Sequence, residues 1–188
     1  MVQLLTKCQF LPSVNQRLVQ VLHEFAQGGS DLHAFFHVVS IIDGIAHFLE
    51  HMLFLGTDKY PDPAEYEEYI TEHGGTRNAF TSFENTTYML DLPRNDPALL
   101  DTALMLMREA ASELTFANDA VARERGVVLS EMRDKKGYQL ANLEDQLAFF
   151  YPQALYPKRL PIGLTGTLDA ATGDSLKAFW HREYVPAK

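Results

Sequence analysis

The feature that most constrains this chain is the pentapeptide His-Phe-Leu-Glu-His at His47 to His51, set in the apolar segment 44–57. Neither proline nor glycine interrupts residues 45–55, so the sequence predicts a helix that continues to Gly56. On a helix, residues three and four positions apart lie on one face. The side chains of His47, Glu50 and His51 are therefore expected to project together.

This triad has two interpretations, a chance cluster or a metal site. Two histidines at i and i+4 can hold one zinc ion, and a neighbouring carboxylate can take a proton from a water molecule at the metal. The order His-x-x-Glu-His is the inverted form of the commoner zinc motif His-Glu-x-x-His. The segment around it is strongly apolar, with Phe48, Leu49 and Met52 among its residues. Because three unpartnered polar groups would be costly to bury there, the metal site is the favoured interpretation.

Composition limits the classes of protein to which the chain can belong. Its 188 residues suit a single domain, and 46% hydrophobic and 22% charged residues are ordinary for a globular protein. The net charge of −9 argues against a nucleic-acid partner, because no basic stripe could neutralise phosphates. No apolar run reaches the length that spans a membrane, so no membrane partner is expected. The single cysteine, Cys8, excludes internal disulfides.

The N-terminal residues bear on location. Met1 to Gln9 contain no basic region followed by a long apolar stretch, which is the pattern of a signal peptide. The chain as written is therefore expected in the cytoplasm. A periplasmic location is the alternative if the true N-terminus is missing.

Periodicity and turn residues predict strands mixed with helices. Extended structure is expected in residues 1–43, at 17–22 and 34–39, and a hairpin is expected from strands 77–82 and 86–92. One helix is expected from Asp62-Pro63 to Gly74-Gly75, and a second begins at Asp96-Pro97 with an apolar stripe formed by Leu100, Ala103, Leu104, Met107 and Ala111. A third is expected from a cap at Asn118 or Asp119 through Met132. Two more helices are expected over 146–151 and 174–183. The predicted fold class is α+β, an antiparallel or mixed sheet flanked by helices.

Two glutamates in the third of these helices illustrate the limit of spacing arguments. Glu124 and Glu131 are seven positions apart, so they share a helix face. Such a charged face is usually solvated. From spacing alone, both side chains would be assigned to the surface.

Three segments resemble the pitrilysin (M16) family of zinc metallopeptidases, which includes insulin-degrading enzymes and mitochondrial processing peptidases. They are residues 44–57, the run His-Gly-Gly-Thr-Arg-Asn-Ala-Phe-Thr at 73–81, and residues 124–132. The resemblance extends over residues 44–188 and is specific. It implies the fold that this family shares with S-ribosylhomocysteine lyase, called LuxS/MPP-like, and the hydrolysis of peptide bonds in polypeptides.

The resemblance also assigns roles to particular residues. Family members bind one zinc ion through the two motif histidines and a downstream glutamate, which correspond here to His47, His51 and Glu131. An upstream glutamate supports the ligands in the family, and Glu124 matches it. Glu50 corresponds to the general base, which takes a proton from the attacking water and passes it to the leaving amine. This assignment replaces the surface interpretation of both helix glutamates.

Two further residues match the substrate-binding strand of the family. Asn78 and Ala79 correspond to an edge strand that pairs with the backbone of the substrate. In this mode of binding, called β-augmentation, main-chain hydrogen bonds give affinity and side-chain pockets give specificity. A plain hairpin position is the alternative for Asn78.

The match to the family is incomplete at both ends of the chain. Residues 1–43 match poorly, whereas 44–188 carry the expected zinc-site core, so residues 1–188 are expected to be a single, partial N-terminal peptidase domain. Family members usually have further homologous domains that close a chamber around the substrate and contain the groups that stabilise the oxyanion. A partner domain or subunit is therefore expected to complete this chain, and no residue here is assigned to the oxyanion.

Two alternatives to a peptidase are consistent with parts of this pattern. A non-catalytic subunit that holds peptides for a partner is one, although family members of that type tend to have lost ligands that are all present here. S-ribosylhomocysteine lyase also carries His-x-x-Glu-His, but its third ligand is a downstream cysteine. Cys8 is upstream, which disfavours the lyase.

Overall fold

The computed structural model describes residues 31–36 and 43–184 of the chain. Three features of the sequence analysis lie outside the described residues: Cys8, the strand predicted at 17–22, and the last residues of the strand predicted at 34–39. Asp31–Phe36 does form a strand, β1, which overlaps the strand predicted at 34–39. That residues 1–188 form one domain stays a prediction.

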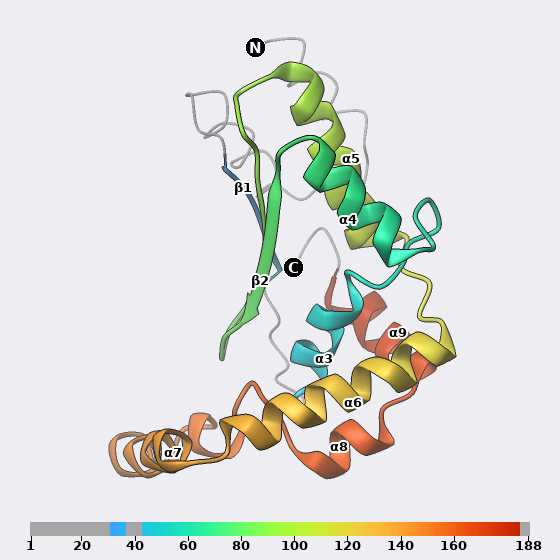
Figure 1. The fold of residues 1–188 in the computed structure, drawn as a ribbon. Helices are drawn as coiled ribbons and strands as arrows, with labels where there is room; N and C mark the ends of the chain where they lie inside the picture. The colour runs from blue at the N-terminus through green and yellow to red at the C-terminus, as the bar shows by residue number, and fades with distance from the viewer. Residues whose placement is uncertain (1–30, 37–42, 185–188) are drawn as a thin grey trace.

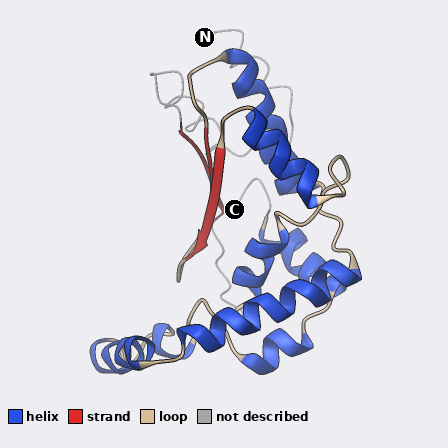
Figure 2. Ribbon diagram, in the orientation of Figure 1, coloured by secondary structure: helices blue, strands red, loops and turns tan. Residues whose placement is uncertain are grey.

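The described elements are strands and helices in mixed order, with a long run of helices after the hairpin (Figures 1 and 2). In chain order they are β1 (Asp31–Phe36), α3 (Ile45–Met52), α4 (Pro63–Glu72), β2 (Thr76–Thr81), β3 (Thr86–Asp91), α5 (Pro97–Ser112), α6 (Asn118–Lys135), α7 (Tyr138–Phe150), the short 3₁₀ helix η1 (Tyr156–Lys158), α8 (Thr165–Ala170) and α9 (Gly173–Glu183). The predicted α+β class is confirmed.

The three described strands form an antiparallel sheet in the order β1-β3-β2. Strands β2 and β3 are the predicted hairpin, in which Asn78 lies opposite Met89 and Thr81 opposite Thr86. Among the described strands, β2 therefore lies at an edge of the sheet. This edge position is the one that a substrate-pairing strand requires.

Two clusters of buried side chains hold the helices to the sheet. Helices α4 and α5 pack beside the strands, where Leu90 of β3 meets Leu100 and Ala103 of α5 (Figure 1). In the second cluster, Phe48 and Leu49 of α3 pack with residues of α6, α8 and α9. Both side chains are fully buried. Each such burial stabilises the fold by roughly 1.5–3 kcal/mol, which anchors α3 firmly in the core.

Most predicted helix starts agree with the structure. The carboxylates of Asp62 and Asp96 accept hydrogen bonds from backbone N–H groups in the first turns of α4 and α5, as N-caps do. On α5, the predicted residues Leu100, Ala103 and Met107 are buried, whereas Leu104 and Ala111 are only partly covered. The helix predicted at 146–151 is longer, since α7 begins at Tyr138, and α9 forms as expected.

The predicted cap of α6 is wrong. Ala117 is the residue before the helix, and Asn118 is already helical, so neither Asn118 nor Asp119 caps it. The preceding residue, Phe116, has a positive φ of 51° and packs its ring 5.6 Å from that of Trp180. No side-chain hydrogen bond caps α6, so local capping chemistry does not set its first residue.

The predicted end of the metal-motif helix is also wrong, because α3 ends at Met52 instead of continuing to Gly56. The N–H groups of Phe54 and Leu55 each bond the carbonyl three residues back, which tightens the chain into a turn. Gly56 has a φ of 143° and its carbonyl accepts a bond from Thr115 N–H. Pairing with this distant segment ends the helix four residues early, without moving the motif out of it.

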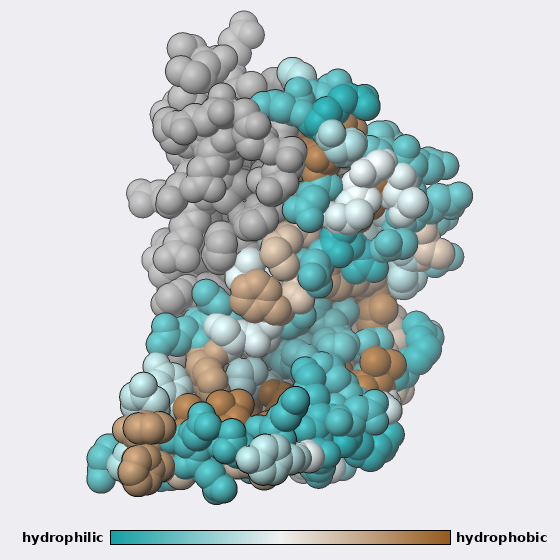
Figure 3. Space-filling view, turned by 60° about the vertical axis from the view of Figure 1, so that its left-hand side comes forward, coloured by the Kyte–Doolittle hydropathy of each residue, from teal (hydrophilic) through white to brown (hydrophobic). Residues whose placement is uncertain are grey.

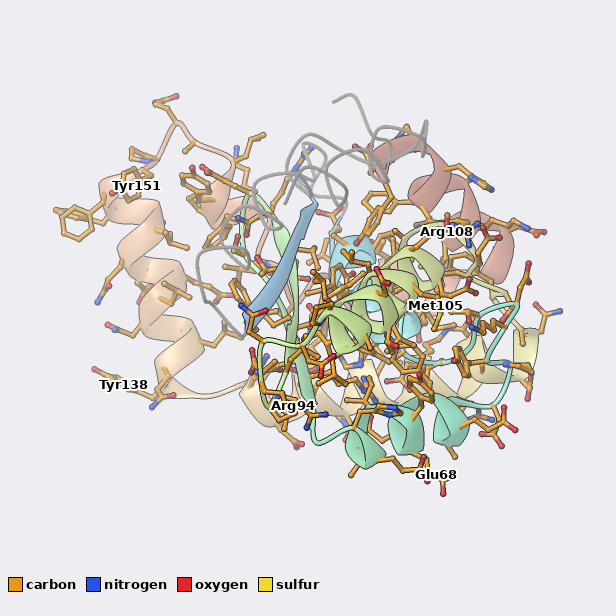
Figure 4. All side chains as sticks on the ribbon, turned by 90° about the horizontal axis from the view of Figure 1, so that it is seen from above. Glu68, Arg94, Met105, Arg108, Tyr138 and Tyr151 are labelled. Atoms are coloured by element: carbon orange, nitrogen blue, oxygen red, sulfur yellow. The ribbon has the colours of Figure 1, made fainter. Side chains whose placement is uncertain are left out.

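Helix α7 differs from the other described α-helices because none of its residues is buried. Its exposed large side chains include Tyr138, Phe149 and Phe150. Seen from above, Tyr138 and Tyr151 project outward near the two ends of this helix (Figure 4). Apolar side chains also interrupt the hydrophilic lower half of the surface in Figure 3. No helix in the part of the chain that the structure describes is long and apolar enough to cross a membrane.

Candidate metal centre

Helix α3 presents the motif from a fixed position. Its N-terminus begins at Gly44, whose φ is 97°, and a β-carbon at this residue would lie 2.7 Å from the Cα of Gly163. Only glycine permits this close approach of two backbone segments. His47 and Glu50 are themselves buried, at 7% and 8% exposure. Two members of the triad are therefore buried, and His51 is partly buried, on a helix that has little freedom to move.

A carboxylate from α6 meets the two histidines. Oε2 of Glu131 lies 3.5 Å from Nε2 of His47 and 3.4 Å from Nε2 of His51. One candidate ligand atom from each of these three residues lies within 4.8 Å of the others. The structure thus brings together residues 84 positions apart in the chain, and their atoms surround a common point.

The donor set suits zinc. Two imidazole nitrogens and one carboxylate oxygen are ligands that zinc binds in catalytic sites, where a fourth position stays open for water or substrate. Nδ1 of His47 is buried and lacks a hydrogen-bond partner among the described residues, whereas Nε2 faces Glu131 and is the atom placed to serve as a ligand. The side chains present therefore fit the metal that the sequence motif indicates.

Glu124 lies beside the candidate ligand His51, as the family resemblance implies. Its Oε1 lies 2.7 Å from Nδ1 of His51. A carboxylate on Nδ1 holds the proton there and leaves Nε2 as a lone-pair donor directed at the metal position. Glu124 and Glu131 share a face of α6, and that face is turned toward α3 rather than toward solvent.

The two histidines titrate differently. Burial, assisted by the neighbouring ring of His51, lowers the pKa of His47 to about 4. Burial also acts to lower the pKa of His51, but the hydrogen bond and charge of Glu124, together with the charges of Glu131 and Glu50, outweigh it and raise that pKa. His47 is consequently neutral at neutral pH, the form in which an imidazole binds metal.

The carboxylates are also shifted in opposite directions. Burial raises the pKa of Glu50, against the opposing effect of a hydrogen bond from Thr81. For Glu131, burial acts to raise the pKa, but the hydrogen bond from Lys135 and the charges of the histidines lower it overall. Glu131 thus favours the ionised form that a ligand needs, and Glu50 has the raised proton affinity that suits a general base.

Thr81 is a site residue to which the sequence assigned no role. Its Oγ1 donates a hydrogen bond of 2.5 Å to Oε2 of Glu50. Thr81 ends strand β2 and lies thirty-one positions from Glu50. Local spacing gives no signal for such a contact, because it depends on how the hairpin packs against α3.

The predicted substrate residues lie on the same strand. Asn78 is exposed and Ala79 is partly buried. The N–H of Ala79 donates a 2.8 Å bond to the side-chain Oδ1 of Asn78. This N–H is thus paired with the side chain of the preceding residue. Strand β2 pairs with β3 on one side, and none of the described strands pairs with its other side.

Comparison with known proteins agrees with this geometry. The family model for insulinase, peptidase family M16, matches residues 40–151. The probable zinc protease PqqL of Escherichia coli (strain K12) is 31% identical over 146 residues, which cover 76% of this chain and 16% of that protein. The chain thus spans about a sixth of the length of this relative.

Solved structures show the same likeness. The first half of the periplasmic protease PqqL from Escherichia coli has a TM-score of 0.75 and 29% identity, over 83% of this chain and 35% of that chain. Pitrilysin has a TM-score of 0.65 and 26% identity, over 82% of this chain and 17% of that chain. The fold and the sequence agree on one class, the M16-type protease domain. The chain belongs to the insulinase family, peptidase family M16.

Proposed function

We propose that this chain is the zinc-binding part of a metalloendopeptidase that hydrolyses peptide bonds in polypeptides. The observation that carries the proposal is the convergence of His47, His51 and Glu131 beside a buried Glu50. One zinc ion per chain would be held by the first three residues. When bound, the ion would supply Lewis-acid chemistry, polarising the water and the scissile carbonyl.

The protein groups would then divide the reaction between them. Glu50 takes a proton from the attacking water as the water oxygen bonds to the carbonyl carbon. The same carboxyl group delivers a proton to the amine nitrogen as the carbon–nitrogen bond breaks. Glu124 keeps His51 oriented throughout. The raised pKa of Glu50 matches this double role, because a base that must also return the proton needs appreciable proton affinity.

Strand β2 would hold the substrate. A peptide that pairs with its outer edge near Asn78 and Ala79 would lie extended, with its backbone satisfied by main-chain hydrogen bonds. Such binding is largely independent of side chains, so polypeptides in general are the proposed substrate class. Selectivity would come from the pockets alongside this edge.

A second candidate function is peptide binding without efficient hydrolysis. The chain spans only 16% of its Escherichia coli relative, and a partner domain or subunit would close the chamber and supply oxyanion stabilisation. The Escherichia coli relative PqqL is a periplasmic protease, which supports the periplasmic alternative for the location of this chain. The cytoplasmic location stays a prediction.

Zinc content and hydrolysis measured together test these proposals. Purified, zinc-supplied chain is analysed by mass spectrometry for metal and assayed with a quenched fluorescent peptide. One zinc per chain with turnover supports the peptidase. One zinc with peptide binding but no turnover supports the incomplete, peptide-holding chain, and a well-folded protein without zinc refutes the metal centre.

A further inference from the structure

The carboxylate of Glu50 accepts a hydrogen bond from the β2–β3 hairpin. Glu50 lies on α3, whereas Thr81, which donates the 2.5 Å bond to its Oε2, is the last residue of β2. An ionised carboxylate can only accept hydrogen bonds, so the single hydroxyl proton of Thr81 must point at Glu50. The bond engages one carboxylate oxygen and leaves the other available for the reacting water.

The direction of this hydrogen bond also determines the direction of the bond between Thr81 and Thr86. Thr81 and Thr86 lie opposite each other in the hairpin, and their Oγ1 atoms are 3.1 Å apart. Since the proton of Thr81 is used on Glu50, Thr86 must donate to Thr81. Thr86 is completely buried, so its hydroxyl is shielded from competing water.

The row of hydroxyls continues to the C-terminal helix. Thr86 also hydrogen-bonds Tyr184, the residue that follows α9, and the Tyr184 hydroxyl lies 2.8 Å from that of Tyr88. Tyr88 and Tyr184 are both buried. Four hydroxyl groups in succession therefore link Glu50 to the core, and a network whose members are all satisfied in this way is rigid.

We propose that Thr81 is a positioning residue: its hydroxyl, backed by Thr86, holds the Glu50 carboxylate in the orientation in which one oxygen faces the water and the scissile bond. The proposal rests on the proposed function and deepens it. Because Thr81 shares strand β2 with Asn78 and Ala79, the strand that would bind the substrate would also set the direction of the base. The same rigid strand would thus position both the substrate and the Glu50 carboxylate, and so fix their geometry relative to each other.

A double-mutant cycle tests the contact without metal or turnover. The variants are Thr81→Val, Glu50→Leu and the double variant, compared by melting temperature in the metal-free chain. Valine keeps the shape and β-branching of threonine, so only the hydroxyl is lost. We expect T81V to lower the melting temperature in the parent chain and to lower it less when E50L is also present, because there only the bond from Thr86 is lost. Additive shifts would overturn the proposal.

Thr76→Val is the matched control for the cycle. Thr76 begins the same strand but is exposed and lies near Asp91 rather than Glu50. Its shift should be the same with and without E50L, because distant sites add independently. Coupling of equal size at Thr76 would show that the cycle reports general destabilisation, and the positioning role would fall.

Kinetics of the zinc-loaded chain test the consequence. We expect T81V to lower kcat by about 10–100-fold, as misplacement of a reacting group does, with KM and zinc content within about twofold of the parent. Thr81→Ser, which restores the hydroxyl, should recover most of the loss. An unchanged kcat in T81V overturns the positioning role alone. Failure of the parent chain to bind zinc instead overturns the proposed function. The double-mutant cycle still tests the contact between Thr81 and Glu50 in that case, because it is measured without metal.

Discussion

Nδ1 of His51 lies 2.7 Å from Oε1 of Glu124, a residue 73 positions further along the chain. The contact joins the motif helix α3 to the long helix α6 at the point where Glu131 also approaches the histidines. One face of α6 therefore provides both the candidate ligand Glu131 and Glu124, the group that orients the candidate ligand His51.

This geometry predicts graded losses of metal affinity. Glu124→Gln should weaken zinc binding by roughly 10–100-fold, because the proton on Nδ1 of His51 is no longer fixed by a charged acceptor. Glu131→Gln should weaken it further, since a ligand is removed. Chelator competition measures both. Asp134→Asn, which changes an exposed acid on the same helix, is the control and should have no effect. Equal affinities in all three variants would exclude the proposed ligand set.

Replacement of the proposed base should separate metal binding from hydrolysis. Glu50→Gln is expected to retain one zinc per chain while peptide hydrolysis falls by roughly 10²–10⁴-fold, the usual contribution of a general base. The measurement pairs metal analysis with a fluorescent peptide assay on the same preparation. Should the variant lose its zinc as well, Glu50 would have to be counted among the ligands.

The close approach at the start of α3 predicts a severe effect of adding one methyl group. In Gly163→Ala the new β-carbon would lie 2.3 Å from the carbonyl oxygen of Asp43, at a residue whose φ is +84°. Overpacking and a left-handed backbone together should lower the free energy of unfolding by about 3 kcal/mol. Urea denaturation measures this loss.

Gly126 provides the control for that substitution. It lies within α6, and a β-carbon there would meet nothing within 4 Å. Gly126→Ala should raise the free energy of unfolding by about 0.5–1 kcal/mol, because alanine is the better helix former. Similar effects of the two substitutions would show that the contact between residues 43–44 and 163 is not maintained in solution.

The buried tyrosine pair predicts loss of stability at alkaline pH. Burial is the main cause that raises the pKa of both Tyr88 and Tyr184 above the usual value of about 10. The folded state thus retains protons that the unfolded chain loses. Their contribution to stability is present in full below about pH 10 and falls as the pH rises from there toward the folded pKa values.

Urea denaturation of the metal-free chain between pH 8 and 11 checks this expectation. Above pH 10 each buried tyrosine should add up to about 1.4 kcal/mol per pH unit to the decline. Tyr184→Phe should decline less steeply, although it should start about 1 kcal/mol lower because the bond to Tyr88 is lost. Parallel curves for the parent and the variant would argue against burial of this hydroxyl.

Much of this protein could be predicted from its sequence because the relevant signals are local. The spacing of His47, Glu50 and His51 places them on one face of any helix that forms there. Asp62 and Asp96 cap their helices through backbone groups two residues away. Alternation of polar and apolar residues likewise predicts the hairpin. Interactions of this range are decided before the chain has a tertiary structure.

The features of the site and fold that the sequence did not predict depend on contacts between distant segments. Spacing alone placed Glu124 and Glu131 on a solvated surface, and only the packing of α6 against α3 turns that face inward. Thr81 reaches Glu50 because the hairpin docks beside α3, and α3 stops at Met52 because Gly56 and Thr57 pair with the segment at Leu114 and Thr115. The sequence by itself determined which groups could hold a metal; the tertiary structure decided which of them meet, because burial and long-range pairing have no fixed period along the chain.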